Sequence, residues 1–226
     1  MTAAEMIVFF DEQAADAAYG INAAVKKRVA SLAVFNVNEQ FKCNLMKSLI
    51  QWRHQVESPR AALLAAVEGF ESGCKAIEFP GYGAAAVGLC SEKVRIVSYL
   101  VDKSIESPPP QEIAGARKLD YLIGQWLHTG ELGRDYDLHL NAEREEALAF
   151  ATYSTYRELM AGVAADEETV GKACRLFDQR KGDTYFSGGD QTEGGGMDNA
   201  FTVDYRLAAI CQKRALPWGA VHRWRW

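Results

Sequence analysis

The amino-acid sequence predicts an all-α protein. Along most of the 226 residues, apolar side chains recur at steps of three and four, the spacing of one face of a helix. No run of alternating β-branched residues competes with this pattern, and proline, glycine and capping residues interrupt it at intervals. We therefore expect a single irregular bundle of about eight or nine helices joined by short links.

The first half contains three of these apolar stripes, and each predicts a helix with one buried face. Their members are Phe41, Leu45, Leu49, Trp52 and Val56; then Leu63, Val67, Phe70, Cys74 and Ile77; then Val87, Cys90, Val94, Val97 and Val101. Ser58 and Pro59 are suited to the start of the second helix, as cap and first-turn residue. We expect Trp52, and Trp126 in the second half, to be buried because each completes a stripe.

Three prolines, Pro108–Pro110, follow the first half. They stiffen the backbone and remove three amide donors, which is typical of a connector between elements. We expect one all-α domain, residues 1–226, whose two halves, 1–106 and 111–226, are joined by this connector.

The second half begins with a stripe that ends near Gly130 and consists of Ala116, Leu119, Ile123 and Trp126. Residues 131–140, ELGRDYDLHL, indicate an irregular segment with a short extended piece. Asn141 is the expected cap of a helix that runs to about Val163, and Asp166 the expected cap of the next. The last helix is predicted by Val203, Leu207 and Ile210, and Pro217 ends it.

The charge of the chain argues against a nucleic-acid partner. Thirty acidic residues stand against 25 basic ones, a net charge of −5, whereas phosphate binding requires clustered positive charge. An acidic protein is better suited to a basic protein partner. The first 13 residues carry neither a basic region nor a long apolar core, and no apolar run reaches the length of a membrane span. We expect a cytoplasmic protein without a signal peptide and without a membrane partner.

The cysteines predict free buried thiols. They are Cys43, Cys74, Cys90, Cys174 and Cys211, an odd number with no CxxC spacing. Each lies at or beside an apolar helical position, which favours buried thiols in a reducing compartment over disulfides or a zinc site.

One short segment carries residues that could bind a divalent metal. Asp135, Asp137 and His139 occupy alternate positions, so on an extended segment all three would face one way. No second ligand cluster accompanies them, and no Gly-x-Ser-x-Gly motif is present elsewhere. We expect no metal, no cofactor and no enzymatic activity; a metal-dependent hydrolase that uses these three residues is the remaining enzymatic alternative.

Residues 187–199, SGGDQTEGGGMDN, contain five glycines and three acidic residues. The segment has no lysine, its acids repel phosphate, and its spacing does not match a calcium loop. We expect a flexible acidic loop that becomes ordered against a basic protein. The predicted partner-binding residues are Asp190, Glu193, Asp198 and Asp204; the alternative, that the loop is only a connector, stays open.

Residues 147–180, ALAFATYSTYRELMAGVAADEETVGKACRLFDQR, and 203–218, VDYRLAAICQKRALPW, carry a family resemblance. Their order of a long Ala-rich helix, an Asp-capped helix and a final helix with a hydrophobic tail resembles the all-α immunity proteins of bacterial polymorphic-toxin and type VI secretion systems. The resemblance implies a cytosolic inhibitor that binds and neutralises a cognate toxin. It covers about the last third of the chain and transfers no binding residue. The alternative is a helical regulatory or adaptor protein with another protein partner.

Overall fold

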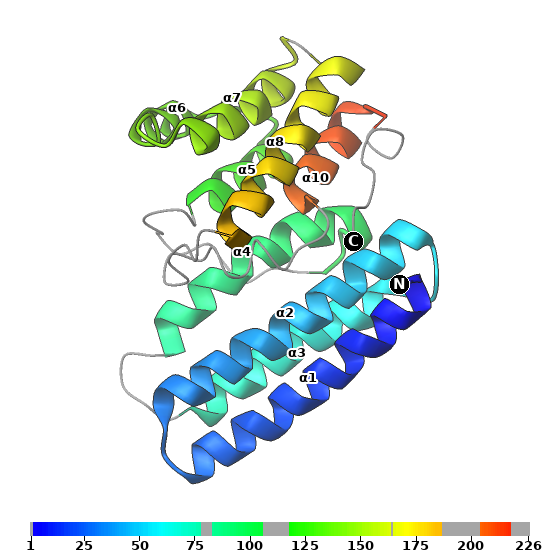
Figure 1. Ribbon diagram of the computed structural model, residues 1–226, viewed down its shortest axis with the longest axis vertical. Coiled ribbons are helices and arrows are strands. Elements are labelled where there is room, and N and C mark those ends of the chain that lie inside the picture. The colour runs from blue at the N-terminus through cyan, green and yellow to red at the C-terminus, as the bar shows by residue number, and fades with distance from the viewer. Residues whose placement is uncertain (1, 78–82, 106–117, 164, 187–203, 218–226) are drawn as a thin grey trace. The chain divides into compact units, whose positions relative to one another are not determined.

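The computed structural model describes residues 2–77, 83–105, 118–163, 165–186 and 204–217, of which 83–91, 118 and 180–186 by their backbone alone. Within these residues the protein is all-α, with nine helices and no strand, which confirms the predicted fold class (Figure 1). None of the described helices combines the length and the apolar character that a membrane span requires.

The chain divides into two compact units, Met1–Gln111 and Glu112–Trp226. The division falls just after the three prolines that the sequence marks as a connector. That the two units fold together as one domain stays a prediction, and each unit is described by itself.

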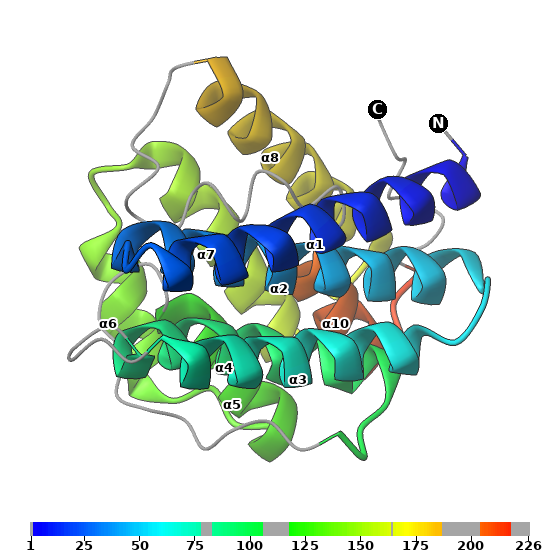
Figure 2. The ribbon, with the colours of Figure 1, turned by 90° about the horizontal axis from the view of Figure 1, so that it is seen from below.

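The first unit is built on an antiparallel helical hairpin. Helices α1 (Ala3–Lys26) and α2 (Ala30–His54) lie side by side, α3 (Pro59–Ala76) packs on α2, and α4 (Gly83–Val101) contacts both α2 and α3 (Figures 1 and 2). A capping box starts α1: the Thr2 amide donates to Glu5 Oε2 at 2.6 Å and the Glu5 amide donates to Thr2 Oγ1 at 3.2 Å. Pro59 occupies the first turn of α3, as predicted.

The stripe on α2 is confirmed over its central part and ends earlier than expected. Phe41, Leu45 and Leu49 are buried, and the Phe41 ring meets Phe70 of α3 edge to face at 5.4 Å. The helix stops at His54, where Gln55 adopts a left-handed backbone. Trp52, in the last turn, is therefore only half-buried, and Val56, beyond the helix, is 37% exposed. The prediction that Trp52 is a fully buried core residue is wrong.

Two glycines on α3 face α2 at different distances. A Cβ atom on Gly73 would lie 2.6 Å from Cγ2 of Val37, a buried side chain with little rotamer freedom. A Cβ atom on Gly69 would lie 3.5 Å from Oε1 of Gln40, at the end of a flexible side chain. The close approach of the two helices therefore depends on Gly73 and not on Gly69.

We predict that alanine has opposite effects at these two positions. Gly69→Ala should raise the free energy of unfolding by about 0.5–1 kcal/mol, because alanine is the better helix former. Gly73→Ala gains the same propensity but overpacks against Val37 by about 1–3 kcal/mol, so the net effect should be a loss. Urea titration of both variants measures the difference, and equal stabilisation would show that the helices separate without penalty.

The second unit contains five described helices: α5 (Lys118–Thr129), α6 (Arg134–Ala142), α7 (Ala147–Ala161), α8 (Glu167–Phe186) and α10 (Tyr205–Arg214). Helix α10 contacts α5, α7 and α8, and α6 contacts α5 and α7. Trp126 is 1% exposed, which confirms its predicted burial. Asp166 caps α8 as predicted, because its Oδ1 accepts from the Thr169 amide at 2.8 Å.

Residues 131–140 differ from the prediction. The expected irregular and extended segment is a helix from Arg134, α6, and Asn141 lies inside that helix instead of capping the next one. Helix α7 begins at Ala147, after Glu146. The alternating polar residues masked the helical pattern: Tyr136 and His139, three apart, are the residues that α6 buries.

Candidate functional site

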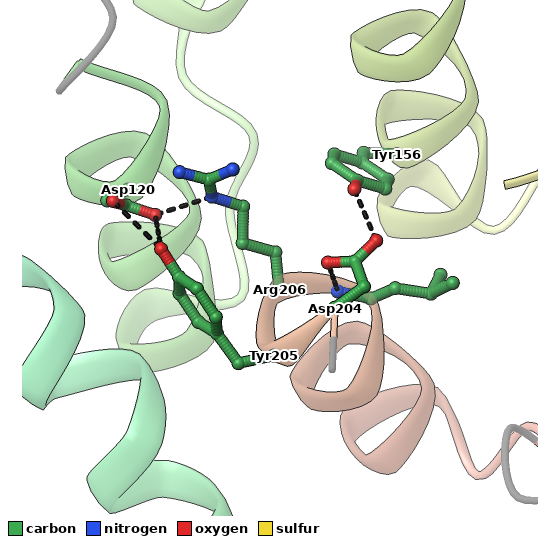
Figure 3. A network of polar contacts seen from close by, with 6 residues as sticks. Asp120, Tyr156, Asp204, Tyr205 and Arg206 are labelled. Carbon is green, nitrogen blue, oxygen red and sulfur yellow. Dashed lines mark hydrogen bonds and ion pairs between the residues drawn. The ribbon is translucent and has the colours of Figure 1, made fainter. Parts of the chain in front are cut away.

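A buried polar network surrounds α10 in the second unit (Figure 3). Its seven residues Tyr205–Cys211 are all buried, which is unusual for a ten-residue helix that includes an arginine. Asp204 starts the helix: its Oδ1 accepts from the Leu207 amide at 3.0 Å. The polar side chains at both ends of α10 are therefore candidates for a functional site.

At the start of α10, Asp120 of α5 accepts hydrogen bonds from two neighbouring side chains. The Tyr205 hydroxyl donates to both carboxylate oxygens at 3.0 and 3.2 Å, and Arg206 Nε donates to Oδ1 at 2.6 Å (Figure 3). The arginine and aspartate side chains are only 8% and 5% exposed. Charges this buried are stable only when paired, so the ion pair joins the first turns of α5 and α10.

The second carboxylate of the network, Asp204, joins α10 to α7. Its Oδ2 accepts from the Tyr156 hydroxyl at 2.5 Å, while Oδ1 caps the helix (Figure 3). Asp204 is 2% exposed and Tyr156 is 1% exposed. Both oxygens of the carboxylate thus have donors from the chain itself.

The end of α10 is joined to the ends of the same two helices. Lys213 Nζ donates to the carbonyl oxygens of Trp126 and Leu127 in the last turn of α5, at 2.8 and 2.7 Å. The Arg214 guanidinium donates to the carbonyl oxygen of Met160 in the last turn of α7. Each cation satisfies terminal carbonyl groups and lies at the negative end of a helix dipole.

The register of α5 and α10 explains why one helix can make both sets of contacts. Arg206 and Lys213 are seven residues apart, two turns of a helix, and so lie on one face of α10. Their partners on α5, Asp120 and Leu127, are also seven residues apart. Because the two spacings match, α10 lies parallel to α5 and is fixed at both ends.

Chemically, this network holds helices together. Its two carboxylates accept from tyrosine, arginine and amide donors of the same unit, and its cations donate to an aspartate or to helix-terminal carbonyl groups. These contacts fix side chains in place and leave their polar groups occupied within the fold. We interpret the network as the clamp that positions α5, α7 and α10.

The residues considered for a metal site do not converge. On helix α6, Asp135 is exposed, Asp137 forms an ion pair with Arg157 of α7, and His139 is buried with its ring stacked 5.6 Å from Tyr153. The hydrogen bond from Arg157 lowers the pKa of Asp137. The described part of the chain holds no group of three or more His, Cys, Asp or Glu side chains that could bind a metal ion.

Of the four predicted partner-binding residues, the structure describes one. Asp190, Glu193 and Asp198 lie outside the described residues, and their role stays a prediction. Asp204 is buried and caps α10, so its carboxylate is not part of an exposed acidic surface in this structure. The structure gives Asp204 a role in the fold, and its contact with a partner stays a prediction.

Sequence reasoning missed Asp120, Arg206 and Lys213, although a signal was present. Asp120 lies three residues before Ile123 and seven before Leu127, which is an apolar-stripe position occupied by an acid. Arg206 and Lys213 repeat that spacing on the last helix with the opposite charge. An acid on one apolar stripe and a cation on another indicate two helices that can pair through buried charge.

The described cysteines are free thiols: Cys43, Cys174 and Cys211 are buried and Cys74 is half-buried, while the side chain of Cys90 lies outside the described residues. Burial raises the pKa of Cys43 to about 11 and that of Cys174 to about 12. Burial also raises the pKa of Cys211, and the neighbouring Asp204 adds to this effect.

We predict that Asp120→Ala lowers the free energy of unfolding by about 3–5 kcal/mol, because the variant breaks the buried ion pair with Arg206 by removing its carboxylate. Asp11→Ala is the matched control: it removes the exposed ion pair with Lys47, which is worth at most about 1 kcal/mol. Denaturant titration gives both values. A loss below that of the control would contradict the clamp.

We predict that thiol ionisation lowers stability at alkaline pH. Thiols of the unfolded chain ionise from about pH 9, the ordinary value, whereas the buried thiols keep their protons to higher pH. The free energy of unfolding should therefore fall progressively above pH 9, and Cys43→Ser should reduce the slope. At pH 8, alkylation followed by peptide mapping should modify Cys74 before Cys43, Cys174 and Cys211; rapid labelling of Cys211 in the native protein would contradict its burial.

Comparisons with known proteins add no relative of this fold or site: no family model, no curated protein and no solved structure matches the chain.

Proposed function

We propose that this protein binds another protein and acts as a bacterial immunity protein, which neutralises a cognate toxin by occluding its active site or holding it inactive. The observation that carries the proposal is that the buried charged and hydroxyl groups of the clamp around α10 are engaged within the second unit. Asp120 and Asp204 serve the fold, so recognition falls to the helical surface. The resemblance of residues 147–180 and 203–218 to all-α immunity proteins supports the same function.

The charge of the second unit supports a basic partner. Residues 112–226 contain 18 acidic and 14 basic side chains, against 12 and 11 in residues 1–111. Exposed acids flank α7 at both of its ends: Glu145 and Glu146 precede it, and Asp166, Glu167 and Glu168 follow it. A surface of this kind attracts a basic protein over long range and raises the rate of association.

The geometry gives no support to the metal-dependent hydrolase. Its three residues lie on a helix, where positions two apart point in widely different directions, and two of them have structural contacts within the second unit. A regulatory or adaptor protein shares the binding step with an immunity protein but does not protect a cell from a toxin. Growth protection therefore separates these two functions.

We predict that the chain restores growth of bacteria that express the toxin encoded beside its own gene, and that the two purified proteins form a stable complex. Their association rate should fall as ionic strength rises, because screening weakens the attraction. Reversing Asp190, Glu193 and Asp198 to lysine should slow association several-fold and change fold stability by no more than about 0.5 kcal/mol.

The matched control reverses three exposed acids of the first unit, Glu12, Glu68 and Glu71, to lysine and so makes the same change in net charge. A smaller effect in the control assigns the attraction to residues 190–198. An equal association rate in both variants and in the wild type would show that residues 190–198 are not part of the interface. The absence of both growth protection and complex formation would overturn the proposed function.

A further inference from the structure

The turn between α1 and α2 combines positive charge with exposed apolar side chains. We define the basic apolar tip as Tyr19, Lys26, Lys27, Arg28, Val29, Leu32 and Phe35. Residues 17–38 contain three cations and no acidic residue, although the chain as a whole carries a net charge of −5. Within the described residues, no carboxylate is in ion-pair contact with Lys26, Lys27 or Arg28.

The apolar side chains of the tip are exposed although the helices that carry them are closely packed. Tyr19 is 78% exposed, Phe35 59%, Leu32 46% and Val29 41%. Between them, Ala24, Ala33 and Val37 are at most 1% exposed. Loose packing of the hairpin therefore does not explain the exposure. Leu32 and Phe35 lie three residues apart and so share one face of α2, and large apolar groups exposed on one face are typical of an interaction site.

Two consecutive residues of the turn are unfavourable choices for the local backbone. Arg28 has φ 57° and follows the end of α1 in a Schellman arrangement, with its amide donating to Val25 O at 3.0 Å and the Val29 amide to Ala24 O at 2.9 Å. Glycine is the usual residue at that position. Val29 is the N-cap of α2 and provides no side-chain acceptor, where serine or aspartate would provide one.

Helix electrostatics accounts for only part of the tip. Lys26 and Lys27 lie at the end of α1, where a cation complements the helix dipole. The dipole explains neither the choice of arginine in a left-handed backbone at position 28 nor the exposure of Leu32 and Phe35. The first amides of α2, which have no side-chain cap, add further hydrogen-bond donors beside the three cations.

We propose that the basic apolar tip binds an acidic segment of a partner protein in which apolar side chains alternate with carboxylates. Carboxylates complement the three cations and the free amides of α2, and apolar side chains cover Leu32, Phe35 and Tyr19. An anionic membrane is the weaker fit, because lipid-binding clusters comprise about four to eight cations and the chain is acidic overall. The inference rests on the proposed function in taking a protein as the occupant; it concerns residues 19–35 of the first unit, whereas the proposed function uses residues 190–198.

The direct test uses a fluorescein-labelled helical peptide of about 16 residues, with glutamate and leucine placed on one face, and a second peptide with lysine in place of each glutamate. Fluorescence anisotropy with the full chain should show the acidic peptide binding at least tenfold more tightly than the basic one. Hydrogen exchange should show new protection within residues 19–35 when the acidic peptide is bound.

The most informative variants introduce residues that suit the backbone of the turn and at the same time remove one side chain of the tip. Arg28→Gly and Val29→Ser introduce the residues that the backbone prefers, so the melting temperature should stay equal or rise. Each should nevertheless weaken binding of the acidic peptide at least fivefold, as should Phe35→Ser. Lys103→Glu and Val8→Ser are the matched controls, because both side chains are exposed in the first unit outside the tip, and they should leave binding unchanged.

Equal binding of the two peptides, or unchanged binding in Arg28→Gly and Phe35→Ser, would overturn the proposal. So would tip-dependent sedimentation with phosphatidylserine vesicles in the absence of peptide binding, or a dimer of the chain that Phe35→Ser dissociates. Toxin protection is measured separately. Peptide binding without protection would support the proposed binding site at the tip and contradict the immunity function. If all three tip variants still protect against the toxin and the chain does not bind the acidic peptide, the immunity function is supported and the binding site at the tip is contradicted.

Discussion

The second unit depends on the buried ion pair between Asp120 and Arg206, together with the contacts of Lys213 two turns further along the same helix. The pair fixes which turn of α10 faces the start of α5, and the lysine fixes the other end against the last carbonyl groups of α5. An apolar seam alone would tolerate a shift along the helix axis. A buried charge does not, because a shift of one turn would separate it from its partner. The polar groups therefore specify the register, and the apolar residues of α10 fill the space that this register defines.

In the first unit, small residues rather than buried charges determine how the helices pack. Its hairpin brings small residues into contact: Ala24 and Ala33 are completely buried, and Gly73 leaves room for Val37. Close approach of helices in this way requires the absence of side-chain atoms at particular positions. Its exposed ion pairs, such as Lys47 with Asp11, contribute little by comparison. One unit is thus specified mainly by shape, and the other mainly by charge within an apolar interior.

Most helices could be predicted from the sequence because their apolar stripes are long. The stripes with Phe41 and Leu45, and with Leu119 and Trp126, identify buried faces correctly. The short helix α6 was missed because its nine residues offer only two buried positions, and alternating acids resemble a strand. The partial exposure of Trp52 depends on where α2 ends, which the stripe does not determine. The clamp was missed because Asp120 and Arg206 are 86 residues apart, and pairing over that distance is set by tertiary contacts. The candidate binding acids Asp190, Glu193 and Asp198 rest on the sequence alone.

The sequence separation within the clamp has a consequence for the order of folding. The helices of the first unit contact their neighbours along the chain, so its hairpin can form from local contacts alone. In the second unit, Asp120 and Tyr156 form their hydrogen bonds to residues 204–206 when these residues, 48 to 86 positions later, reach them. Contacts of such separation form slowly, because a long loop must close before they stabilise anything. During synthesis, α5 and α7 must therefore exist for a time without their contacts to α10 and with an exposed apolar surface, which makes the interval before α10 emerges a stage at which this protein is exposed to misassembly.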